Sequence, residues 1–229
     1  MKLTNQHIEQ LYKFTRQHYV EHYDVQTELV DHLANDIEQI WVDKPQLSFE
    51  QARDISFKKF GVFGFMDVVE EKQKQLEKKY RKILWKYTKE WFGLPKILLV
   101  ISLIFFFYYF IQLPIGVYIM GVIIFLIAIL DLYFVTKLKK EFKKRTNTNG
   151  KKWMLEEMIF NVASFGGVIV ASNLPQIFNH IENTPSSIGA IVISVIITLT
   201  IIYSYVTLIV IPKKSEELLE EHYPEYKLV

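Results

Sequence analysis

The residues best suited to chemistry in this chain lie in the segment QTELVDHLANDIEQIW. Glu28 and His32 are four residues apart, as are His32 and Asp36, so one face of a helix would carry two carboxylates and an imidazole. Such a face could hold a metal ion, or tune the imidazole as a proton acceptor, because a neighbouring carboxylate favours the charged ring. A commoner use of the same spacing is ionic contacts that fix how the helix packs.

One hypothesis is therefore a metal-dependent membrane enzyme built on Glu28, His32 and Asp36, with a further ligand from His18 or His22. The sequence has no HEXXH motif or other metalloprotease pattern. It also has no cysteine, which excludes disulfides, thiolate nucleophiles and cysteine-based zinc or iron-sulfur sites. Since no catalytic set is complete, we expect a non-enzymatic protein with no catalytic residues, no cofactor and no bound metal.

A second candidate is Asp131, which lies near the end of a long apolar run. At 1.5 Å per residue it is about 9 Å along a helix from Lys137, close to the headgroups, where it could pair with Lys137 or Lys139. An acidic residue at membrane depth is a functional hypothesis by default. On that hypothesis the protein is a small transporter or channel-like subunit, with Asp131, Asn161 and Asn173 on the transport path.

Small residues form a third pattern. Ala163, Gly167 and Ala171 recur every four residues, a spacing that lets another helix approach closely. Packing of helices is the commoner explanation of this pattern. A homo-oligomer is expected under the transporter hypothesis.

Four apolar segments must position these residues. Each has close to the ~20 residues that a helix needs to cross the hydrocarbon core. They are residues 94–112, 115–135, 158–178 and 188–211. Lys96 is the only charged residue between Trp91 and Leu130. We therefore expect an all-α protein with a small N-terminal helical domain, residues 1–93, followed by a transmembrane domain, residues 94–212, of four helices in two hairpins.

The residues of the N-terminal domain predict four amphipathic helices. Thr4 is a plausible N-cap of the first, and Ser48 with Gln51 predicts a capping box at the start of the third. Gly61 is expected to end the third helix in the left-handed conformation. The expected helices are about 4–23, 24–41, 48–60, and one that begins near residue 65.

The distribution of lysine and arginine predicts the orientation. All 27 lie in the head, at Lys96, in a basic loop, residues 136–157, or in the tail, residues 213–229. The positive-inside rule then places both termini and the basic loop in the cytoplasm. Eight of them lie between Lys137 and Lys152, where each would attract anionic lipid by about 1 kcal/mol near the headgroups. Topology accounts for these lysines, so we expect no direct binding of nucleic acid.

The segments ELVDHL, residues 28–33, and LSFEQARDISFKKFG, residues 47–61, resemble the HAAS-type helical signalling domain. The resemblance covers about residues 5–75. It implies a domain that precedes a few spans in a bacterial cytoplasmic membrane, carries no catalytic residues, and has a cytoplasmic protein partner in a regulator of the PadR class. It also implies that Glu28, His32, Phe60 and Gly61 are signature positions for packing or docking.

These observations favour an integral membrane protein whose cytoplasmic head docks a partner or transmits a regulatory signal. The small transporter and the metal-dependent enzyme remain the alternatives.

Overall fold

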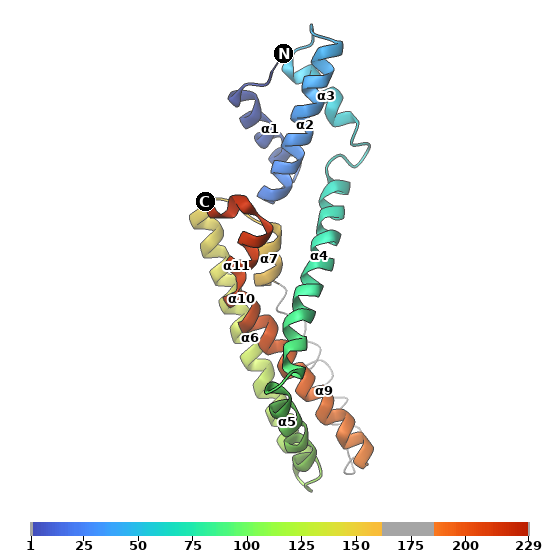
Figure 1. The fold of residues 1–229 in the computed structure, drawn as a ribbon, viewed down its shortest axis with the longest axis vertical. Coiled ribbons are helices and arrows are strands. Elements are labelled where there is room, and N and C mark those ends of the chain that lie inside the picture. Colours follow the sequence, from blue (N-terminus) through green and yellow to red (C-terminus); the bar gives the residue numbers. More distant parts are fainter. Residues whose placement is uncertain (1, 162–185, 229) are drawn as a thin grey trace. The chain divides into compact units, whose positions relative to one another are not determined.

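The structure is a computed structural model that describes residues 2–161 and 186–228 (Figure 1). All regular secondary structure in these two ranges is helical, so the predicted all-α class is confirmed there. Contacts divide the chain into two compact units. The head unit contains Met1–Lys79 and Gly150–Leu155, and the apolar unit contains Tyr80–Asn149 and Glu156–Val229.

The head unit contains three helices and the first part of a fourth. They are α1 (Asn5–Gln17), α2 (Tyr23–Asp43), α3 (Phe49–Lys58) and α4 (Met66–Lys89). Helix α2 packs against both α1 and α3. Its buried stripe recurs at spacings of three and four residues, as helical geometry requires: Val25, Leu29, Val30, Leu33, Ile37, Ile40 and Trp41. Burying one such leucine or isoleucine stabilises the fold by about 1.5–3 kcal/mol.

Local signals fix the ends of these helices. The Ser48 hydroxyl accepts from the Gln51 amide while the Gln51 side chain accepts from the Ser48 amide, so the predicted capping box is confirmed. Thr4 caps α1 in the same way with His7. Gly61 follows α3 with φ +78°, which confirms the left-handed turn expected there.

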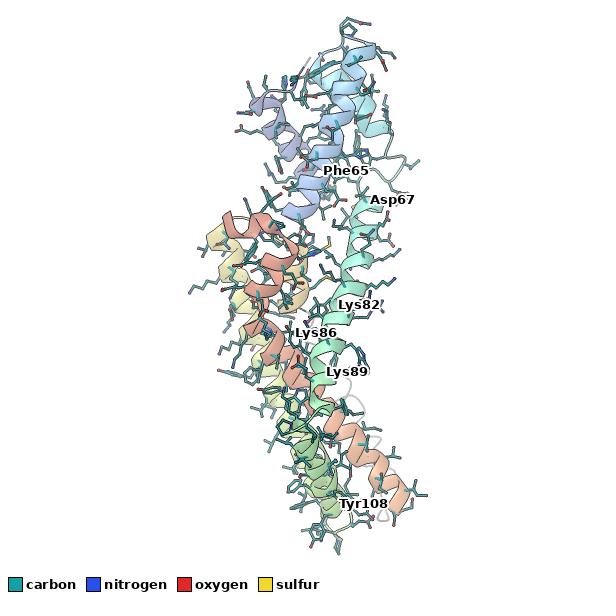
Figure 2. All side chains as sticks on the ribbon, in the orientation of Figure 1. Phe65, Asp67, Lys82, Lys86, Lys89 and Tyr108 are labelled. Carbon is teal, nitrogen blue, oxygen red and sulfur yellow. The ribbon has the colours of Figure 1, made fainter. Side chains whose placement is uncertain are left out.

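The apolar unit contains the rest of the helical structure, apart from Met154 and Leu155, which belong to the head unit. Its elements after α4 are η1 (Glu90–Phe92), α5 (Lys96–Ile111), α6 (Gly116–Asn149), α7 (Met154–Asn161), α9 (Ser187–Tyr205), the π-helical segment η3 (Val206–Val210), α10 (Ile211–Lys213), α11 (Ser215–His222) and η4 (Pro224–Leu228). Figure 2 places Lys82, Lys86 and Lys89 in the C-terminal half of α4 and Tyr108 near the end of α5.

Helices α5, α6 and α9 share one apolar core, with α5 in contact with the other two. Its buried members are Phe107, Ile111, Met120, Ile124, Ala190 and Ile197. On α9 the small residues Ala190, Ser194 and Thr198 are fully buried and four residues apart. The hydroxyls of Ser194 and Thr198 each donate to the carbonyl four residues earlier, so these polar groups are satisfied inside the helix. A small-residue stripe therefore exists on α9.

Within residues 2–161 and 186–228, two helices are long and apolar enough to cross a membrane: Tyr118–Asn149 and Ser187–Lys213. Helix α5 has 16 residues and counts as a third only together with α4, from which it bends by 81° at the Gly93 and Pro95 break. Most of the third predicted span, residues 158–178, lies outside the described residues, which stop at Asn161 and resume at 186.

The basic segment differs from the expected loop at residues 136–157. Helix α6 continues through most of it and ends at Asn149, after which Gly150 has φ +63°. The reason is composition, because lysine, glutamate, leucine and arginine are good helix formers and residues 136–149 contain no glycine or proline. The helix ends where the first glycine allows a left-handed turn.

Candidate functional site

Two carboxylates of α2, those of Glu28 and Asp36, have a lysine partner from another part of the head unit. Glu28 forms an ion pair with Lys72 of α4. The Asp36 Oδ1 atom lies 2.6 Å from Nζ of Lys59, just after α3. Burial is the largest single influence and would raise the pKa of Asp36. The hydrogen bond and the charge of Lys59, with contributions from Ser56 and His32, together outweigh burial and hold this pKa below its usual value. Both carboxylates therefore tie α2 to its neighbours.

His32, the imidazole between them, faces an aromatic ring. It meets Phe60 edge to face, with 5.5 Å between ring centroids. Glu28, His32 and Asp36 thus share a helix, as the sequence predicts, but each contacts a different partner. Among the described residues no group of three or more histidine, aspartate or glutamate side chains is placed to hold a metal ion.

Phe60 belongs to an aromatic cluster at the end of α3. Its ring lies 4.9 Å from that of Phe65, which is buried, and Phe65 lies 4.8 Å from Phe57. Phe14 of α1 and His18, just after that helix, complete the cluster through contacts with Phe57. This packing fixes the position of the turn that follows.

That turn, residues 61–64, presents two apolar side chains to solvent. Val62 is 98% exposed and Phe63 is 71% exposed. Gly64 has φ +56°, and a Cβ there would lie 3.0 Å from the Phe57 ring, so the turn is tightly packed on its inner side. We call residues 61–64 the docking turn, because exposed apolar groups on a fixed turn suit contact with another molecule.

The head unit also holds the connection between α6 and α7. The Tyr23 amide donates to the Lys152 carbonyl at 2.7 Å, and the Met154 amide donates to Asp24 Oδ1 at 3.2 Å. Tyr23 is the first residue of α2, where backbone N–H groups have no partner within the helix. The connection therefore supplies a hydrogen bond that the start of α2 needs. We call this set of contacts the clasp.

Side chains close the clasp on both sides. Lys152 Nζ lies 2.8 Å from Glu21 Oε2, and Lys151 Nζ lies 4.1 Å from the centre of the Tyr23 ring. Trp153 is 1% exposed and meets the same tyrosine edge to face at 5.2 Å. Sequence reasoning missed the clasp. The available signal was a tryptophan in an otherwise polar segment, which favours burial.

In the apolar unit, Asp131 on α6 accepts a hydrogen bond from Ser204 on α9 at 2.8 Å. Both residues are 8% exposed. The hydroxyl of Ser204, rather than the expected Lys137 or Lys139, is the partner that the structure gives to this carboxylate. Asp131 therefore links two of the apolar helices.

The other predicted polar and small positions are separate from Asp131 or outside the described residues. Asn161 donates from Nδ2 to Glu157 Oε1 at 3.2 Å, within α7. Asn173 and the stripe Ala163, Gly167 and Ala171 lie outside the described residues. A transport path through all three of Asp131, Asn161 and Asn173 stays a prediction.

A second buried carboxylate, Glu156 of α7, anchors the C-terminal tail. It is 1% exposed; its Oε1 lies 3.9 Å from Arg145 Nη1 and accepts from the Tyr226 hydroxyl at 3.4 Å. Burial raises the pKa of Glu156, and the charge of Arg145 partly offsets that shift. Arg145 also contacts Glu216 at 3.6 Å. The arginine thus joins α6, α7 and the tail.

The described residues thus show two lysine-paired carboxylates on α2, an exposed apolar turn, and a clasp on the connection between α6 and α7. Comparison of the chain with models of protein families, with curated proteins and with solved structures gave no match.

Proposed function

We propose that this chain is a four-span protein of a bacterial cytoplasmic membrane whose cytoplasmic head docks a protein partner and transmits its binding to the spans. The observation that carries the proposal is the clasp. Through it, residues 150–155, which join α6 to α7, belong to the same compact unit as α1–α3. A change in the head therefore acts directly on a segment covalently attached to an apolar helix.

The physical basis of transmission is the shortness of the connection. Helix α6 ends at Asn149 and α7 begins at Met154, so little slack separates the clasp from either helix. A flexible linker would dissipate a movement, whereas a segment held by two hydrogen bonds, an ion pair and a buried ring would pass it on.

The four-span topology rests on charge and on chain direction. Helix α6 ends in a lysine-rich segment, and the apolar helix that begins at Ser187 ends at Lys213 and Lys214. If both basic ends are cytoplasmic, the chain must cross the membrane between Asn149 and Ser187, and the predicted span at residues 158–178 supplies that crossing. The span at 94–112 gives the fourth.

The sequence has no cysteine, so single cysteines can be introduced to test this topology without first removing any. We expect a cysteine replacing Lys143 to resist a membrane-impermeant maleimide in intact cells and to react after permeabilisation. A cysteine replacing Leu113, in the short turn after α5, is the matched control and should react in intact cells. Labelling of Lys143→Cys from outside would invert the topology and remove the head from the cytoplasm.

We further propose that the partner contacts the docking turn, and that it is a regulator of the PadR class, as the resemblance to HAAS-type domains implies. The test uses the full-length protein in lipid nanodiscs and a purified regulator of that class from the same genome. Phe63→Ser should weaken binding at least about tenfold, because an exposed apolar anchor is lost. Val42→Ser is the control, since Val42 is also 71% exposed but lies at the end of α2. Equal binding by both variants would refute the contact at the docking turn, and no binding by the wild type would refute this partner.

A further inference from the structure

A groove lies beside Asp131 in the apolar unit, and the docking proposal gives it no role. It has a volume of about 220 Å³ and lies between α6, α9 and η3. Most of the residues that line it are apolar, among them Leu130, Phe134 and Leu208. Its polar residues are Asp131, Ser204 and Tyr205. A single carboxylate thus lies in a mostly apolar groove.

The carboxylate has unused capacity. Two oxygens can accept about four hydrogen bonds, and the structure gives Asp131 one, from the Ser204 hydroxyl. No lysine, arginine or histidine within the described ranges forms an ion pair with it. Because a carboxylate at 8% exposure in apolar surroundings is costly without a counter-charge, the groove is suited to a positively charged ligand.

We propose that this groove binds a primary ammonium group attached to a short apolar stem. An ammonium has three N–H donors, which can be shared between the two Asp131 oxygens and the lone pairs of the Ser204 oxygen. The volume corresponds to about seven water molecules at ~30 Å³ each, enough for an ammonium and a few carbon atoms.

The lining disfavours a metal ion. Calcium and magnesium take about six or more oxygen ligands, and the side chains of the groove offer one carboxylate, one serine hydroxyl and the Tyr205 hydroxyl among apolar walls. Those walls instead match the hydrocarbon stem of an organic amine. The backbone contributes to the shape, because η3 begins immediately after Tyr205 and supplies Leu208 and Ile209 to the lining. Such π-helical segments occur frequently at functional sites.

The position of the groove indicates an aminophospholipid headgroup as the source of the amine. Tyr205 lines the groove and packs edge to face on Trp91 at 5.4 Å, and Lys96 Nζ lies 5.6 Å from the Trp91 ring centre. Tryptophan, tyrosine and lysine gather at the headgroup level of membrane proteins. Leu130 and Tyr205 are 56% and 42% exposed, so the groove is open at the surface of the apolar unit.

The test compares two headgroups that differ in N–H donors. Full-length protein is purified in detergent with equal amounts of phosphatidylethanolamine and phosphatidylcholine, and the retained lipids are counted by native mass spectrometry. The quaternary ammonium of phosphatidylcholine has no N–H to donate. We expect wild-type protein to retain the ethanolamine lipid at least about tenfold more than the choline lipid, since charge-assisted hydrogen bonds are strong.

Two variants and one further ligand make the result decisive. Asp131→Asn should abolish the preference, whereas Ser194→Ala should keep it, because the Ser194 hydroxyl bonds to its own helix. If Asp131→Asn does not fold, Asp131→Glu, which keeps the charge, should retain the preference in part. Equal retention of the two lipids by the wild type, or a preference that survives in Asp131→Asn, would overturn the proposal. Protection against heating by ethylammonium but not by phosphatidylethanolamine would support the ammonium site and refute the lipid source. The proposal does not depend on the docking function.

Discussion

Replacing Trp153 with alanine should open the clasp while leaving the rest of the protein folded. The indole is 1% exposed and packs edge to face on Tyr23, beside the hydrogen bond between the Tyr23 amide and the Lys152 carbonyl. Its loss removes the largest apolar contact of residues 150–155. The ion pair between Lys152 and Glu21 remains, but it is partly solvent-exposed and contributes little.

The expected magnitude follows from burial. Truncation of a buried tryptophan to alanine costs about 3–5 kcal/mol, which includes the lost contact with an aromatic neighbour. Since about 1.4 kcal/mol corresponds to a tenfold change in an equilibrium constant, a loss of this size should make the clasp open more often by a factor between about 10² and about 4 × 10³. If the free energy needed to open the clasp in the wild type is smaller than this loss, the Tyr23 amide of the variant should have no protection from exchange.

Hydrogen exchange at the Tyr23 amide measures this opening directly, because its partner in the closed state is the Lys152 carbonyl. The full-length protein in nanodiscs is suitable, with amides of α2 near Leu33 as an internal reference for the folded head. Trp85→Ala is the matched control. Trp85 is 66% exposed, so its removal should change exchange at Tyr23 by less than about threefold.

One result would refute the reasoning. If Trp153→Ala shows wild-type protection at Tyr23 and an unchanged reference in α2, the indole does not hold the connection to the head. The clasp could not then be the route by which the head acts on the spans.

Three other predictions concern packing and charge. Ser194→Leu should lower the melting temperature of the purified protein, because residue 194 is fully buried in the small-residue stripe of α9 and overpacking costs about 1–3 kcal/mol; an unchanged melting temperature would show that α9 has room there. Gly64→Ala should destabilise the head by about 1–2 kcal/mol from left-handed strain, and more from its contact with Phe57, as measured by denaturant unfolding; a neutral result would contradict the fixed turn. The pKa of Asp36 is held below its usual value because Lys59, Ser56 and His32 together outweigh burial, so its stabilising contribution is present above pH ~4 and is lost as pH falls through the lowered pKa. Wild type should therefore exceed Asp36→Asn in stability at neutral pH and lose that advantage in acid, and a difference independent of pH would refute the pairing.

Features set by neighbouring residues could be predicted from the sequence. The capping box of Ser48 and Gln51 needs a spacing of three residues, and the left-handed turn at Gly61 needs the absence of a side chain. The buried stripe of α2 follows from helical periodicity. In each case the physical cause lies within a few residues of its effect, so the pattern is visible in the chain.

Features that join distant residues could not be predicted. Lys152 and Glu21 are 131 positions apart, and Ser204 and Asp131 are 73 apart, so no local pattern pairs them. A lysine near Asp131 looked the better partner by charge, yet a serine on α9 holds the carboxylate because helix packing brings it there. The basic segment was expected as a loop from its charge, although its residues also favour the helix that it forms.

The continuity of α6 has a mechanical consequence. From residue 136 to Asn149 the helix extends about 21 Å beyond the predicted end of its span, at 1.5 Å per residue. An unbroken helix resists twisting. The direction in which Asn149 faces around the helix axis is therefore set by the direction in which Asp131 faces. One residue inserted between them would turn that end by about 100°, whereas seven would nearly restore its phase.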